Sequence, residues 1–271
     1  TAIEIPKTVF GGRVTRAQTL MAEQNFDLLI ATPSTNFQYF AGYNPGRSER
    51  LIALLIPQQG NAVIISPSFE RERILRRSTV TQIDTWEEHE NPFKLTAMVT
   101  KRLKVSSERI GIEPTTNYVD YLRLRDELPK ADVRDGSPVF NELRMAKSRE
   151  ELEAIQKAVD ITLASIAATH QQLKEGLSEQ EVAGMLSREM SSRGSRGGGL
   201  VQFGPSSALP HGGPTGVKLS KGIVVLIDAG CSVDGYTSDI TRTIYWGGDT
   251  TPKYREVYNT LFEAQQSAAA I

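Results

Sequence analysis

The sequence has 271 residues, 39% of them hydrophobic, so it can bury the core of one large domain or of two ordinary ones. Its 31 basic and 32 acidic side chains leave a net charge of -1, which gives no electrostatic footprint for nucleic acid or an anionic membrane. The longest apolar runs, such as 51–57 and 223–228, are far shorter than the roughly 20 residues that cross a bilayer. We therefore predict a globular protein without a transmembrane helix, whose partner is small or near-neutral.

The chain has one cysteine, Cys231, which excludes an intramolecular disulfide and is predicted to be a small buried side chain. The sequence opens with Thr1 and polar residues, without the charged start and apolar run of a secretory signal. These features favour a cytoplasmic location, with a periplasmic or secreted location after signal removal as the alternative.

Residues 13–135 alternate between short apolar runs and amphipathic stretches, the pattern of an α/β domain. We predict strands at 27–31, 51–56, 62–66, 82–85 and 109–112. The predicted helices lie near 15–24, 69–77, 93–103 and 118–128. Gly136, Ser137 and Pro138 end this alternation, so the domain boundary is predicted near residue 140.

Beyond that boundary, the sequence first predicts two helices. A long helix follows Ser148, and its spacing predicts a buried stripe of Leu152, Ile155, Val159, Leu163 and Ile166. Ser178 and Glu181 form the capping box of a second helix, which is predicted to run through Met190. The glycine-rich segment 194–199 is interpreted as a flexible loop rather than a phosphate cradle, because no Lys-Ser or Lys-Thr follows it.

The last elements carry two aspartates. We predict strands at 223–228 and 235–246, joined by a turn, and then a helix at 253–270. Asp228 closes the first strand and Asp239 lies inside the second, where an ionised carboxylate is costly unless it is paired or bound to metal. If the strands form a hairpin, both acids face one cavity, and Thr241 can donate a hydrogen bond to a ligating carboxylate. This arrangement predicts a site for hard divalent cations.

A structural alternative stays open at this point. Asp228 can cap a turn and Asp239 can pair with a basic residue such as Arg242, since two acids at this spacing often occur by chance. His211 favours the metal site, because it lies in the Pro- and Gly-rich turn 208–213, which can present an imidazole to a site. An isolated histidine in such a loop is otherwise an ordinary surface residue.

These motifs resemble the pita-bread metallopeptidases, which include aminopeptidase P, prolidase and methionine aminopeptidase. The resemblance is carried by Val-Leu-Ile-Asp-Ala-Gly at 225–230 and Gly-Tyr-Thr-Ser-Asp-Ile-Thr-Arg-Thr at 235–243. Segment 141–151 resembles the entry to the catalytic domain, and Asn-Phe-Gln-Tyr-Phe-Ala-Gly at 36–42 resembles part of the creatinase and prolidase N-terminal domain. That N-terminal domain excludes a plain methionine aminopeptidase.

The resemblance implies a fold and a set of roles. It implies a creatinase/prolidase-type α/β N-terminal domain at 1–140 and the first half of an α+β pita-bread catalytic domain at 141–271. Asp228 would chelate one of two divalent metal ions, Asp239 would bridge both, and His211 would contact the substrate or the developing oxyanion. Thr241 would be a hydrogen-bond donor behind the ligands.

The implied reaction is hydrolysis of the peptide bond before proline in proline-containing peptides, by a homodimer. Manganese is the first choice of metal, because an oxygen-rich site with one imidazole suits it, and cobalt or zinc would bind too. Both an Xaa-Pro aminopeptidase and a dipeptidase fit these motifs. The alternatives are a non-catalytic pita-bread binding module and a creatinase-like hydrolase of a non-peptide C–N bond, which needs no metal.

One departure from the family concerns the remaining ligands. The family completes its five-ligand site with a His and two Glu from later strands, whereas this sequence ends at Ile271. The resemblance therefore implies that this stretch holds an incomplete active site and is incapable of efficient turnover alone. We expect the complete enzyme to be longer.

Overall fold

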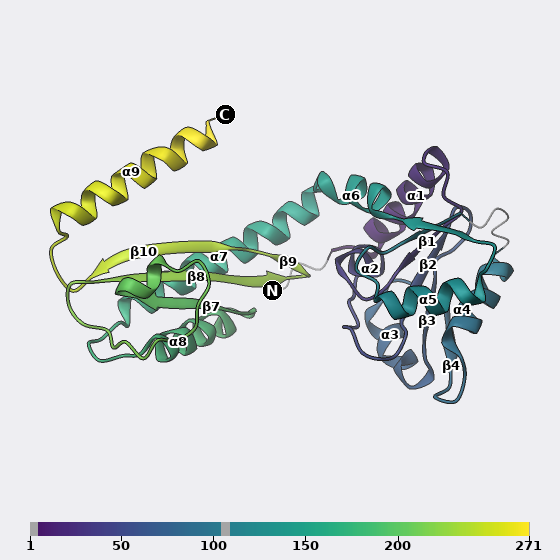
Figure 1. Cartoon of the computed structure of the whole chain (residues 1–271), viewed down its shortest axis with the longest axis horizontal. Coiled ribbons are helices and arrows are strands. Elements are labelled where there is room, and N and C mark those ends of the chain that lie inside the picture. The colour runs from purple at the N-terminus through teal and green to yellow at the C-terminus, as the bar shows by residue number, and fades with distance from the viewer. Residues whose placement is uncertain (1–4, 104–108, 271) are drawn as a thin grey trace. The chain divides into compact units, whose positions relative to one another are not determined.

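The computed structural model describes residues 5–103 and 109–270, which form two compact units (Figure 1). The first unit ends at Glu150 and the second begins at Glu151. The boundary predicted near residue 140 falls within helix α6 (Ser137–Met145), which packs into the core of the first unit. In the described part of the chain, no helix combines the length and apolar character that crossing a membrane requires.

The first unit is built on a six-stranded sheet of order β4-β3-β2-β1-β5-β6. Strand β2 runs antiparallel to β1 and β3, and the other neighbouring strands are parallel. The bounds of the strands are β1 (Leu28–Ala31), β2 (Ala53–Pro57), β3 (Val63–Pro67), β4 (Ile83–Trp86), β5 (Arg109–Ile112) and β6 (Asp132–Asp135). The predicted α/β pattern is confirmed, and the five predicted strands are present together with a polar edge strand, β6, that was not predicted.

Helices cover both faces of this sheet and thereby bury strands β1, β2 and β3 at every position. Leu29 and Ala31 face the core beneath α1, α2, α3 and α6, whereas Leu28 and Ile30 face the core beneath α4 and α5. The bounds are α1 (Lys7–Glu23), α2 (Thr35–Ala41), η1 (Ser68–Glu70), α3 (Arg71–Arg77), α4 (Pro92–Arg102) and α5 (Tyr118–Glu127). The short helix α2 was not predicted, and α1 is longer than predicted.

The second unit has a four-stranded antiparallel sheet, with β8 between β10 and β7 and the short β9 also paired with β8 (Figure 1). The predicted hairpin is therefore confirmed, and Val225, Ile227 and Ala229 of β8 face a core shared with α7 and α8. The bounds are α7 (Arg149–Gln171), α8 (Glu179–Ser192), β7 (Arg196–Phe203), η2 (Gly204–Ala208), β8 (Ile223–Val233), β9 (Tyr236–Thr237), β10 (Ile240–Trp246) and α9 (Pro252–Ala269).

The buried face predicted for helix α7 is largely wrong. Leu152 and Leu163 are exposed, and the buried positions of the helix are Glu151, Ala154, Ala158, Ile161, Thr162, Ser165, Ile166 and Thr169. Small side chains face the sheet because the helix approaches it closely: the Cys231 thiol donates to the Ala158 carbonyl at 3.3 Å. Cys231 is buried, as predicted.

The glycine-rich segment is a strand, which corrects its interpretation as a flexible loop. Residues 196–203 form β7, which pairs with β8 along its whole length. A Cβ atom on Gly197 would lie 2.5 Å from the Gly230 carbonyl oxygen, and one on Gly199 would lie 2.3 Å from the Asp228 carbonyl oxygen. The glycines are therefore needed for close approach of the two strands, and not for flexibility.

Candidate functional site

Asp228 lies on the face of β8 that points away from the shared core. The antiparallel register places Thr241 of β10 directly opposite Asp228. The Thr241 hydroxyl donates a hydrogen bond of 2.9 Å to Asp228 Oδ1. The aspartate is therefore oriented by its cross-strand neighbour and does not cap a turn.

Asp239 lies immediately before β10, not inside a continuous strand as predicted. The strand is interrupted because Ser238 turns inward, where its hydroxyl lies 2.8 Å from Thr162 Oγ1 and accepts from the Cys231 amide at 3.1 Å. A Cβ atom on Gly230 would lie 2.1 Å from the Ser238 carbonyl oxygen, so only glycine fits opposite this segment. The side chain of Asp239 is exposed.

Asp239 lies two positions before Thr241, and both side chains are exposed. The alternative ion pair is not formed in the described part of the chain: the Arg242 guanidinium donates to the Thr241 carbonyl at 2.8 Å. The two aspartates thus offer hard oxygen ligands of the kind that divalent cations take. Among residues 5–103 and 109–270, no three His, Cys, Asp or Glu side chains gather as a larger ligand group.

The loop that carries His211 is fastened at both ends by Glu179, a residue that the sequence did not single out. One carboxylate oxygen of Glu179 accepts from the Phe203 amide and the Ser206 hydroxyl, each at 2.9 Å. The other accepts from the Thr215 amide at 2.6 Å and the Thr215 hydroxyl at 2.9 Å. Glu179 is only 1% exposed, whereas His211 at the middle of the loop is exposed.

The environment of Glu179 lowers its pKa below the ordinary value. Burial by itself raises the pKa, but hydrogen bonds from the Thr215 and Phe203 amides and from the Ser206 and Thr215 hydroxyls outweigh it. The carboxylate therefore stays ionised near neutral pH and holds both ends of the loop.

Replacing Glu179 with glutamine is expected to destabilise the second unit by about 2–3 kcal/mol, because the new amide group meets donors instead of accepting from them. Denaturant unfolding of the variant would measure this loss. Glu175→Gln is the matched control, since Glu175 is an exposed residue just before the same helix and should change stability little. Equal stability of the Glu179→Gln variant and the wild-type protein would contradict the role of Glu179 in holding the two ends of the loop.

The Glu179 carboxylate should also make the stability of the fold depend on pH. Because the pKa of Glu179 is lowered in the folded state, its stabilisation is fully present above the ordinary value of 4.5. The stabilisation is lost as pH falls through the lowered folded-state pKa. Unfolding experiments across this acid range should therefore show a steeper loss of stability in wild type than in Glu179→Gln, and parallel curves would contradict the assignment.

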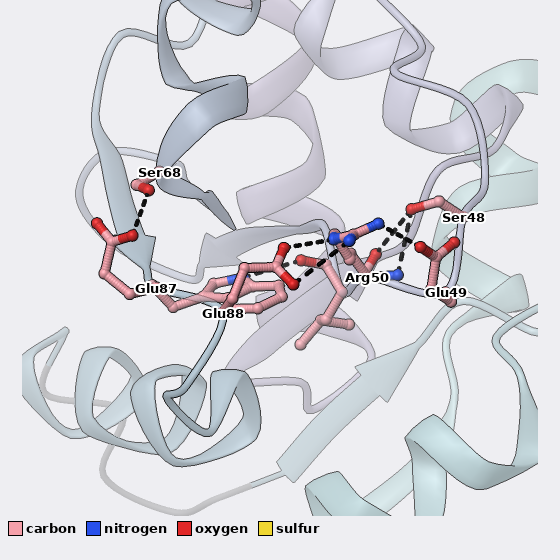
Figure 2. A network of polar contacts seen from close by, with 8 residues as sticks. Ser48, Glu49, Arg50, Ser68, Glu87 and Glu88 are labelled. Carbon is pink, nitrogen blue, oxygen red and sulfur yellow. Dashed lines mark hydrogen bonds and ion pairs between the residues drawn. The ribbon is translucent and has the colours of Figure 1, made fainter.

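A separate polar cluster lies in the first unit, at the end of β4. Figure 2 shows Arg50 between Glu49 and Glu88, and its Nε donates to Glu88 Oε1 at 2.5 Å. This hydrogen bond lowers the pKa of Glu88. The cluster borders a cavity of about 500 Å³ that is also lined by Trp86 and Phe93. The ion pair joins the segment before β2 to the segment after β4 beside that cavity.

Comparison with known proteins finds a family match for each unit. Residues 153–271 match the family described as metallopeptidase family M24, and residues 13–146 match the creatinase/prolidase N-terminal domain. An uncharacterized peptidase from Staphylococcus aureus is 31% identical over 248 residues, which cover 90% of this chain and 69% of the relative.

Two solved structures are similar over nearly the whole chain. The dipeptidase PepE from Mycobacterium ulcerans is 27% identical with a TM-score of 0.87, and the match covers 98% of this chain and 72% of that one. A recombinant prolidase from Thermococcus sibiricus is 30% identical with a TM-score of 0.85, and the match covers 96% of this chain and 71% of that one. The expected creatinase-type N-terminal domain and pita-bread catalytic fold are thereby confirmed.

Proposed function

Since this chain belongs to metallopeptidase family M24 and carries a creatinase/prolidase N-terminal domain, we propose that the full-length protein hydrolyses the peptide bond preceding proline. The observation that carries this proposal is the hydrogen bond by which Thr241 of β10 orients Asp228 of β8, with Asp239 lying immediately before β10. The prolidase fold of the relative from Thermococcus sibiricus supports the same substrate class.

The proposed metal ligands in this chain are Asp228 and Asp239. Their carboxylates fit hard divalent cations, and the hydrogen bond from Thr241 to Oδ1 of Asp228 fixes how that carboxylate is presented. When bound, two divalent ions would supply Lewis-acid activation of water and of the substrate carbonyl. We propose manganese as the first choice, with cobalt or zinc as alternatives.

The other groups would position the peptide. Glu179 holds the ends of the loop, and His211 at its middle would hydrogen-bond the substrate or the developing oxyanion. Proline has no amide hydrogen, so a strand-like clamp on the scissile bond is unavailable and a dedicated pocket is needed. The His211 loop would form one wall of that pocket.

The proposal also covers the organisation of the whole enzyme. The family resemblance supports a site of five metal ligands, of which Asp228 and Asp239 would be two. It also supports a creatinase/prolidase-type N-terminal domain followed by a catalytic domain, and a homodimer as the assembly. Sedimentation of the full-length protein would test the dimer.

A peptide panel tests the proposed specificity. The full-length protein with manganese should cleave alanyl-proline at least about tenfold faster than alanyl-alanine, because a pocket built around a substrate group rejects analogues that lack it. An Xaa-Pro tripeptide in the same panel separates an aminopeptidase from a dipeptidase. Metal-independent hydrolysis of a non-peptide C–N bond would favour the creatinase-like alternative, and absence of any hydrolysis would favour a binding module.

A further inference from the structure

Strand β7 carries a buried amide that has no partner. The Gln202 side chain is 1% exposed, and its Nε2 makes no hydrogen bond with any of the described residues. A buried donor without an acceptor destabilises a folded protein, and most such groups in native proteins are paired. The presence of a glutamine at this position therefore requires an explanation.

The position of Gln202 connects it with the proposed site. Gln202 lies opposite Leu226 of β8, and Leu200 lies opposite Asp228, so Gln202 and Asp228 are diagonal neighbours on one face of the sheet. The amide lies beneath the loop that carries His211: a Cβ atom placed on Gly212 would be 3.0 Å from Gln202 Nε2. The free donor thus faces the residue next to His211.

The loop above this amide is held only at its ends. Glu179 fastens Phe203 and Ser206 on one side and Thr215 on the other. Between these ends, no hydrogen bond within the described structure involves residues 211–213. Two of these residues are glycines, whose peptide groups can rotate at little steric cost.

We propose that Gln202 is a positioning residue for His211. Its Nε2 donates to a carbonyl oxygen of segment 211–213 when a peptide occupies the site, and this bond fixes the middle of the loop. The inference rests on the proposed function, in which His211 contacts the substrate. It explains why a strand whose neighbouring positions are glycine and apolar residues carries one buried amide.

A stability comparison tests whether the amide is unpaired in the free protein. Gln202→Leu removes the donor with little change of shape, so its melting temperature should equal or exceed that of wild type. Gln18→Leu is the control, because Gln18 Nε2 donates to the Pro57 and Gly60 carbonyls at 3.0 and 2.8 Å. This control should melt at a lower temperature. An equal loss in both variants would overturn the proposal.

A double-mutant cycle tests whether Gln202 acts through His211. Hydrolysis of alanyl-proline by the full-length manganese-loaded enzyme should show a kcat for Gln202→Leu that is about ten- to a hundredfold lower, with KM little changed. The Gln202→Leu, His211→Ala double variant should lose no more than His211→Ala alone, because the loop then has no imidazole to position. Additive losses, or an unchanged kcat in the single variant, would overturn the proposal.

The design separates failure of this inference from failure of the proposed function. If wild type cleaves alanyl-proline and His211→Ala is impaired, only the Gln202 variants decide the inference. If wild type cleaves no Xaa-Pro peptide, the proposed function fails and the kinetic role of Gln202 fails with it. The melting temperatures would then still report whether the amide is paired.

Discussion

Replacing Asp239 with asparagine is expected to remove most of the bound divalent metal and to abolish peptidase activity of the full-length protein. The proposed bridging role requires two anionic oxygens at Asp239, and asparagine offers one neutral oxygen. The loss of affinity should exceed the roughly 10- to 100-fold that loss of an outer hydrogen-bond partner costs. Metal content measured by elemental analysis after dialysis is the direct readout.

Two further variants provide comparisons for the metal content of Asp239→Asn. Thr241→Val removes the donor to Asp228 Oδ1 and should weaken metal binding by the smaller factor of about 10 to 100. Asp249→Asn changes an exposed aspartate just beyond β10 and should leave the metal content unchanged. Retention of both metals by Asp239→Asn would refute the bridging role.

Replacing His211 with alanine should lower kcat by about 10²–10³-fold while the metal content stays that of wild type. The reason is that the proposed role of the imidazole is to donate to the substrate or the developing oxyanion, and the loop that carries it is fastened by Glu179 independently of any metal. Steady-state kinetics on alanyl-proline and elemental analysis of the same sample provide the two readouts.

The control for His211 is His89→Ala, since His89 is an exposed histidine in the first unit. This variant should retain wild-type kcat. Unchanged turnover in His211→Ala would contradict the proposed contact with the substrate or oxyanion. Loss of metal in that variant would instead indicate that His211 contributes to metal binding.

The hairpin of the candidate site was predictable because its signals are local. The apolar run that ends at Asp228, the turn at Asp234 and Gly235, and the alternation around Thr241 all lie within a few residues of each other. The structure pairs these segments in the expected antiparallel arrangement. It differs at Asp239, because Ser238 turns inward to meet Thr162, a residue of a distant helix.

The remaining features depend on contacts between distant segments. Glu179 resembles any acidic residue in the first turn of a helix, and its partners lie on both sides of a loop that the chain reaches only later. Gln202 follows glycines that suggest a loop, whereas they permit close strand pairing beside Asp228. In helix α7, leucine spacing predicted the wrong face because close packing against the sheet selects small residues such as Ala158.

The most direct test of metal-dependent cleavage before proline is a reconstitution assay on the full-length protein. The protein would be stripped of metal with a chelator and assayed on alanyl-proline before and after addition of manganese, cobalt or zinc. We predict no cleavage by the stripped protein and recovery of activity with added metal in wild type but not in Asp239→Asn. Equal cleavage with and without metal would contradict this prediction.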